Sequence, residues 1–252
     1  MNATAGPRRL GFGVFTFVLI VVLTGLGLWQ LQRRAEKHAL IAALSQRLAA
    51  APQPLPAAAQ WSAMEPTTDE FRRVTLKAAY MQLPDAMVYS AGSAVRDDIS
   101  GAGTWAFIPA RLASGETVVI NAGFIANTMQ DRGVEDRAVK ALVRGEAETL
   151  TGYIRFPEAA GWLTPAENPA KRLWFVRDHL AMAKSLGWGG VAPFYIDLEQ
   201  PVPPNGIPKP GPLSVHLKDD HLQYAITWFA LAGVLAVAFA FWLRGQRRFS
   251  PG

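Results

Sequence analysis

The sequence HLQYAITWF, residues His221 to Phe229, begins an apolar run that continues to Leu243. This run is the strongest indication of the fold class of the chain. No charged residue occurs from Tyr224 to Leu243, and that length is close to the ~20 residues that a helix needs to cross the hydrocarbon core of a membrane. In a helix that begins at His221, Tyr224 and Trp228 lie on the same face as the histidine. The stretch therefore predicts a membrane helix with an imidazole at the end that lies at the membrane–water interface.

Two interpretations of this histidine follow from the residues alone. An imidazole above an aromatic face at a membrane boundary is able to ligate a flat, apolar, metal-bearing ring. Tyrosine and tryptophan are also common at membrane interfaces without any ligand, and a histidine there is often an ordinary interfacial side chain. The pattern leaves both interpretations open.

A second apolar run, from Leu10 to Gln32, lies near the other end of the chain and also contains no charged residue. Arg8 and Arg9 precede it, and Arg33 and Arg34 follow it. A cleaved signal peptide is the competing interpretation, but the run exceeds the ~7–15-residue apolar core of such peptides. We therefore expect an uncleaved membrane anchor.

Two membrane helices would place both chain ends on one side of the membrane. Arg8 and Arg9 precede the first run, and Arg244, Arg247 and Arg248 follow the second. The positive-inside rule then places both termini in the cytoplasm, or in the matrix of a mitochondrion, with the central domain on the outer side. Because the residues before the first run do not form an amphipathic transit helix, we expect a multi-pass protein of the bacterial inner membrane with a periplasmic domain.

Composition excludes several classes of function. The 252-residue chain has no cysteine, which excludes disulfides, thiolate nucleophiles, iron–sulfur clusters and covalently attached c-type haem. The net charge of +5 comes largely from the basic residues beside the apolar runs, so it indicates contact with the lipid bilayer, and we expect no nucleic-acid partner. No nucleophile elbow, phosphate loop or zinc-ligand pattern occurs, and we expect that the chain is not an enzyme.

The middle of the chain is rich in alternating apolar positions that are typical of strands. A helix is expected from about Asp178 to Leu186, where Asp178 can cap the start and Gly187 follows the end. Proline-rich residues Pro201–Pro212 indicate an extended linker. The strands are expected at 73–80, 87–91, 105–112, 117–125, 148–156 and 194–198.

These expectations define the fold class as α+β: two transmembrane helices flank a small, mainly antiparallel β extracytoplasmic domain that has one late helix. The expected parts are a cytoplasmic N-terminus (1–9), a first membrane helix (10–32), an exit helix with a Pro-rich turn (33–56), the periplasmic α+β domain (57–200), a Pro-rich linker (201–220), a second membrane helix (221–243) and a basic cytoplasmic tail (244–252).

Four stretches together resemble the surfeit locus protein 1 family. The first resembles the opening motif of the family, and the last, which runs from His221 to Phe229, resembles its closing motif. Between them, a central strand and an Asn-Pro…Trp…Arg-Asp segment are similar to those of the family. The four are 25–34 (GLGLWQLQRR), 118–125 (VVINAGFI), 168–178 (NPAKRLWFVRD) and 221–229 (HLQYAITWF).

The resemblance implies an assembly factor for cytochrome c oxidase that helps to deliver or insert haem a into the large subunit of this haem–copper oxidase. By position, it implies that His221 is the ligand of the haem iron and that Tyr224 and Trp228 wall the ring, with Trp29 facing them from the first span. The implied partners are the oxidase large subunit and haem a synthase. A departure from the family pattern is Ala122, where the family has an arginine in Asn-Arg-Gly, so any contact made by that arginine is in doubt here.

A second interpretation of the resemblance is a membrane scaffold that carries no haem and that binds and stabilises the nascent oxidase subunit. Haem that copurifies with the protein would distinguish the two.

Overall fold

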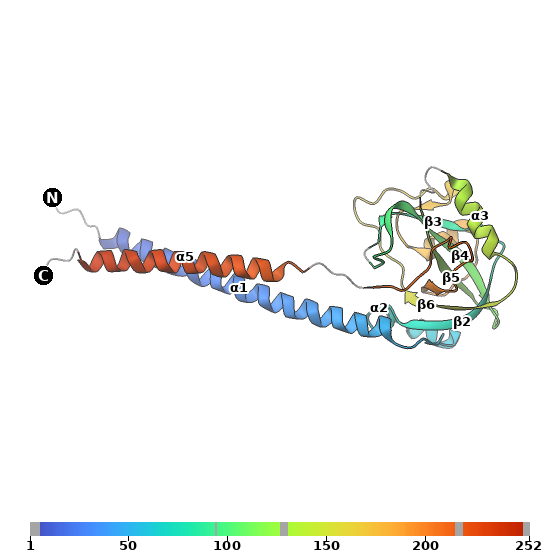
Figure 1. Cartoon of the computed structure of the whole chain (residues 1–252), viewed down its shortest axis with the longest axis horizontal. Helices are drawn as coiled ribbons and strands as arrows, with labels where there is room; N and C mark the ends of the chain where they lie inside the picture. The colour runs from blue at the N-terminus through green and yellow to red at the C-terminus, as the bar shows by residue number, and fades with distance from the viewer. Residues whose placement is uncertain (1–5, 94, 127–130, 215–218, 249–252) are drawn as a thin grey trace. The chain divides into compact units, whose positions relative to one another are not determined.

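The computed structural model describes residues 6–93, 95–126, 131–214 and 219–248, and the chain divides into two compact units. A helical unit contains residues 1–42 and 217–252, and a domain contains residues 43–216. Figure 1 shows the helices of the first unit and the sheet of the second.

The helical unit consists of α1 (Gly6–Ala49), whose last residues belong to the domain, and α5 (His221–Arg248). The two helices lie side by side (Figure 1): Phe12 contacts Trp242 with ring centroids 5.1 Å apart, and Gly27 lies directly against Phe229. A side chain at position 27 would collide with that ring, so the glycine permits the close approach of the helices.

Both helices are long and apolar enough to cross a membrane, over Leu10–Ala49 and His221–Gly245. Most of their large apolar side chains point outward, as lipid-facing side chains do. The predicted spans at both ends of the chain are therefore present as helices, and α5 begins at His221 as expected.

The described part of the domain contains an eight-stranded mixed sheet with short helices. Its order is β1-β2-β6-β8-β5-β4-β3-β7, and most neighbours are antiparallel, as the sequence predicted. The strands are β1 (Gln53–Pro54), β2 (Arg73–Tyr80), β3 (Ala86–Gly92), β4 (Ser100–Leu112), β5 (Thr117–Ala126), β6 (Glu148–Arg155), β7 (Leu173–Trp174) and β8 (Tyr195–Gln200). The helices are η1 (Ala58–Ala63), α2 (Pro66–Asp69), α3 (Arg132–Leu142), η2 (Pro169–Lys171) and α4 (His179–Leu186).

Five strands close into a ring, because β2 pairs with β4 as well as with β6. Alternate residues of β2, β6, β8, β5 and β4 point inward and form one core with side chains from η1 and α3. Several of these inward residues are alanines, which suit the narrow interior of a ring with few strands. The inward side chains include Val74, Leu76, Ala78, Ala106, Ile108, Ala110, Val118, Ile120, Ala122, Leu150, Ile154 and Ile196.

A second core lies on the outer face of the sheet, under α4. Trp105, Phe107 and Tyr195 from the sheet pack against Met182 and Ala183 of this helix. The helix matches its prediction: the Asp178 side chain accepts hydrogen bonds from two backbone amides of the first turn, and Gly187 ends it in the left-handed conformation.

The structure adds features of the domain that were not predicted, among them the short helices η1, α2 and η2 and the start of β4 at Ser100. Strands β1 and β7 are two residues long, too short for a periodic signal, and α3 was missed altogether. Residues 201–214, which the sequence assigned to a linker, run over the domain instead: the Gly211 amide donates to Leu198, Lys209 pairs with Phe124 across an isolated bridge, and Leu213 is buried.

The return of this segment across β5 requires a glycine at position 123. Gly123 has a φ of +127°, and a Cβ there would lie 2.4 Å from the backbone carbon of Lys209. Gly115 also has a positive φ, +103°, but nothing lies within 4 Å of its Cβ position. We predict that Gly123→Ala lowers the unfolding free energy of the domain by roughly 2 kcal/mol more than Gly115→Ala does, because only the first adds a collision. Chemical denaturation of both variants measures this, and equal losses would contradict it.

Burial of Glu135 predicts a pH dependence of stability. Burial raises the pKa of this carboxyl to about 8, although the Thr104 hydroxyl and the Arg132 charge oppose the shift. Because the folded domain keeps a proton that the unfolded chain has released, the contribution of Glu135 is full below pH 4.5 and is lost as the pH rises towards 8. The unfolding free energy of wild type should therefore fall over this range relative to Glu135→Gln, by at most about 1.4 kcal/mol per pH unit. The exposed Glu146→Gln is the control, and a difference between wild type and Glu135→Gln that is constant with pH would refute the prediction.

Candidate functional site

The candidate site lies around His221, at the first turn of α5. The Asp219 side chain accepts a hydrogen bond of 3.0 Å from the backbone amide of His221, and the Tyr224 amide donates to the Asp220 carbonyl at 3.2 Å. A carboxylate that accepts from a first-turn amide stabilises a helix start both by hydrogen bonding and through the helix dipole. This cap explains why α5 begins at His221.

The imidazole of His221 contacts the other membrane helix. Its Nδ1 atom lies 2.7 Å from Oε1 of Gln30 on α1, and the histidine side chain is partly buried between the helices. The histidine is thus a fixed residue of the helix pair.

Asp219 joins the two helices by a second set of contacts. Its Oδ2 lies 2.7 Å from Nε2 of His38 and 3.5 Å from Nε of Arg34, while its Oδ1 binds the start of α5. Burial would raise the pKa of Asp219, but the hydrogen bonds from the His221 amide and from His38 outweigh it, and the pKa lies below its ordinary value. A negative charge is therefore held where α5 begins.

The aromatic residues of the predicted site lie on the surface of the helical unit. Tyr224 and Trp29 are 55% and 51% exposed, and Trp228 is partly buried. Among the described residues, no ring contact joins Trp29 to Tyr224 or to Trp228. The three rings are therefore not packed into one another, and the role predicted for each stays a prediction.

These residues have the chemistry that a flat, apolar ligand requires. The imidazole is fixed through Nδ1, and exposed aromatic side chains stand one residue from Gln30 and one turn after His221. Imidazole is the usual protein ligand of haem iron. The donor set and the exposed apolar surroundings therefore suit a planar, metal-bearing, lipid-soluble group better than a hydrated ion.

Sequence reasoning missed the polar residues that organise this site. Gln30, Arg34 and His38 follow one another at intervals of four on α1, and together they contact His221 and Asp219. The spacing of four across an apolar-to-polar boundary is the signal that would have found them.

The domain also contains a buried polar network around Arg155, whose members bond to one another. Arg155 pairs with Glu70 at 3.1 Å and with Asp197 at 3.4 Å, and Asn121 donates to Asp197 at 2.6 Å. A cavity of about 300 Å³ beside Arg155 is lined by residues of β3 and by Phe175 and Arg177, among others. We infer that this network has a structural role, because its charged side chains are paired with one another inside the protein.

Further positions in the domain have structural roles. His179 is buried and contacts the Ala192 carbonyl at 3.0 Å, and burial lowers its pKa. Ala122 is fully buried inside the ring of strands, so this position serves packing here. Asp98 binds Arg96, and His216 lies outside the described residues.

Comparison with known proteins identifies the family of this chain. The model of the SURF1 family matches residues 17–233, from within α1 to within α5. The chain belongs to the SURF1 family. The matched range contains Gln30, Asp219, His221 and the complete domain.

Full-length relatives agree with this assignment. Surfeit locus protein 1 of Rattus norvegicus is 33% identical, over 94% of this chain and 76% of its own length. The Homo sapiens protein of the same name is 31% identical, over 93% and 78%. A SURF1-like protein of Monosiga brevicollis is 27% identical, over 98% and 93%. The SURF1 similarity therefore extends through both helices and the domain.

The Asp219 contacts predict that this carboxylate holds the helices together at this end. Spin labels at Leu40→Cys and Gln223→Cys, both exposed, are site-specific because the chain has no cysteine of its own. We expect Asp219→Ala to broaden the electron–electron distance distribution between them, since the helix cap and the bonds to α1 are lost together. Arg33→Ala, which removes an exposed pair within α1, is the control and should change nothing. An unchanged distribution in Asp219→Ala would exclude the proposed bridge.

Proposed function

We propose that this chain is an assembly factor for cytochrome c oxidase that binds haem a at the outer membrane interface and aids its delivery to the large oxidase subunit. Membership of the SURF1 family, whose members act in cytochrome c oxidase assembly, supports the first part. The observation that carries the second part is the position of His221: an imidazole fixed by a second membrane helix, at the end of an apolar span and beside exposed aromatic side chains.

In this proposal His221 supplies the nitrogen that ligates the haem iron. Tyr224 and Trp228 offer aromatic faces from α5, and Trp29 offers one from α1. Haem a brings a redox-active iron and a long apolar tail, and the lipid-facing surface of the helices suits such a tail. One histidine ligand in an open interface lets the cargo leave more readily than a closed cage with two ligands would.

The proposed topology follows from charge and from the helix pair. Phe12 and Trp242 are in contact, so the first residues of α1 and the last residues of α5 lie at the same end of the pair. The positive-inside rule places that end, with the terminal arginines, in the cytoplasm and the domain in the periplasm of a bacterial inner membrane. The partners we propose are the large oxidase subunit, which receives the haem, and haem a synthase, which supplies it.

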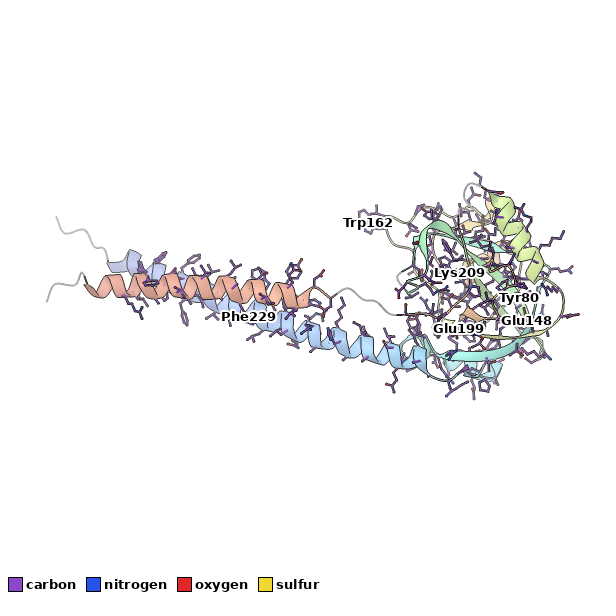
Figure 2. The ribbon with its side chains drawn as sticks, viewed as in Figure 1. Tyr80, Glu148, Trp162, Glu199, Lys209 and Phe229 are labelled. Atoms are coloured by element: carbon purple, nitrogen blue, oxygen red, sulfur yellow. The ribbon has the colours of Figure 1, made fainter. Side chains whose placement is uncertain are left out.

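One observation favours the second candidate function, a haem-free scaffold. Trp162 and Leu163 are 93% and 74% exposed, on a loop of the domain (Figure 2). Hydrogen bonds between Gly161 and Thr164 in both directions make this loop a defined turn that presents the two apolar side chains to solvent. Exposed tryptophans are frequent anchors of protein interfaces, so this turn would serve a protein that docks on the oxidase.

The optical spectrum of the purified protein tests the proposed function. We expect wild type, isolated in detergent from cells that make haem a, to show a haem a spectrum. His221→Ala should lose at least tenfold of the bound haem, because no other described residue supplies an imidazole at this position.

Two controls accompany this spectrum. Arg33→Ala removes only an exposed pair within α1 and should leave the haem bound, and Gly115→Ala alters a loop of the domain only. A colourless wild-type protein from cells rich in haem a would favour the scaffold, and haem that persists unchanged in His221→Ala would exclude His221 as its ligand.

A further inference from the structure

The hydrogen bond between His221 and Gln30 carries information about where the imidazole proton lies. Nδ1 of His221 is 2.7 Å from Oε1 of Gln30. An amide oxygen only accepts hydrogen bonds, so the nitrogen that contacts it must carry the hydrogen. In a neutral imidazole the other nitrogen, Nε2, then has a free lone pair.

We propose that Gln30 is a positioning residue that holds His221 in the Nδ1–H tautomer and so leaves Nε2 as the metal-binding atom. The assignment of haem iron as the metal rests on the proposed function, whereas the tautomer itself does not. Metal-bound histidines generally donate their second N–H to a fixed oxygen, which sets the direction of the ring and raises the basicity of the ligating nitrogen. Gln30 provides that oxygen from a separate helix.

Gln30, and not Asp219, is the hydrogen-bond partner of the His221 ring. The Asp219 carboxylate is close, but its Oδ1 binds the His221 backbone amide and its Oδ2 binds His38 and Arg34. Among the described residues, Gln30 is therefore the side chain that contacts the ring through a hydrogen bond. Because neutral imidazole in water favours the opposite tautomer, with the proton on Nε2, removal of Gln30 should reverse the arrangement.

Histidine ¹⁵N NMR reads the tautomer directly, without haem. The full chain, labelled with ¹⁵N-histidine and placed in lipid nanodiscs, is measured at pH 8, above the ordinary histidine pKa of about 6.5. The chain has four histidines, and the His221 signals are those that disappear in His221→Ala. For wild type we expect a protonated Nδ1 and an unprotonated Nε2 at this residue.

Three variants separate positioning from simple packing. Gln30→Leu keeps a side chain of similar size but removes the acceptor, so the proton should move to Nε2. Gln30→Glu keeps an oxygen acceptor and should keep the proton on Nδ1. Gln32→Leu, on the same helix but bonded to Glu36, is the matched control and should behave as wild type.

The result that overturns the proposal is an Nε2–H tautomer in wild type, as it would be if the Gln30 amide turned its NH₂ group towards the ring. A tautomer that Gln30→Leu leaves unchanged would overturn it equally. In protein loaded with haem a, Gln30→Leu should weaken retention by about 10–100-fold, the usual effect of losing such a partner, while Gln30→Glu retains it. If the NMR result holds but no variant or wild type binds haem, the tautomer assignment stands and the proposed function fails.

Discussion

A pair of polar contacts between two membrane helices is the constraint on which the site depends. The His221 ring meets Gln30, and the Asp219 carboxylate meets His38 on α1 while it also caps α5. Such hydrogen bonds stabilise the association of membrane helices. Burial of apolar side chains between the helices contributes little, because lipid tails are as apolar as the side chains that they contact. Gly27 complements them by letting Phe229 approach. The polar end of the pair thereby fixes one imidazole, while the aromatic side chains around it stay at the surface.

The domain depends on a different constraint, the closure of five strands of its sheet into a ring. Pairing of β2 with β4 removes two strand edges and encloses a narrow interior that alanines and branched aliphatic residues fill. Its buried charges are matched by partners, as the bonds among Arg155, Asp197 and Asn121 show. Among the described residues of the domain, no group of three or more His, Asp or Glu side chains is placed to hold a metal ion. The exposed turn at Trp162 instead suits contact with another protein, so binding of cargo and docking on a partner can be carried by different parts of one chain.

Much of the fold was predictable because it depends on local patterns. Apolar runs gave both helices, alternation gave β2 with its observed bounds, and Asp178 with Gly187 marked α4. Helix α3 was missed because a glutamate, Glu135, is one of its buried residues and breaks the apolar stripe. The closed ring depends on the pairing of β2 with β4, two strands that are separated in the sequence. Periodicity within one strand does not predict which strand it pairs with. In the candidate site, the sequence singled out His221, whose role stays a prediction, but Gln30, Arg34 and His38 become meaningful only once α1 lies beside α5.

The central claim is that His221 binds the iron of haem a, and resonance Raman spectroscopy of the reduced, haem a-loaded protein tests it most directly. A bond between iron and a histidine nitrogen gives an iron–nitrogen stretching band whose frequency falls when the histidines carry ¹⁵N. We predict such a band in wild type, its shift with ¹⁵N-histidine and its absence in His221→Ala. A haem a complex without an isotope-sensitive band, or with the same band in His221→Ala, would contradict it.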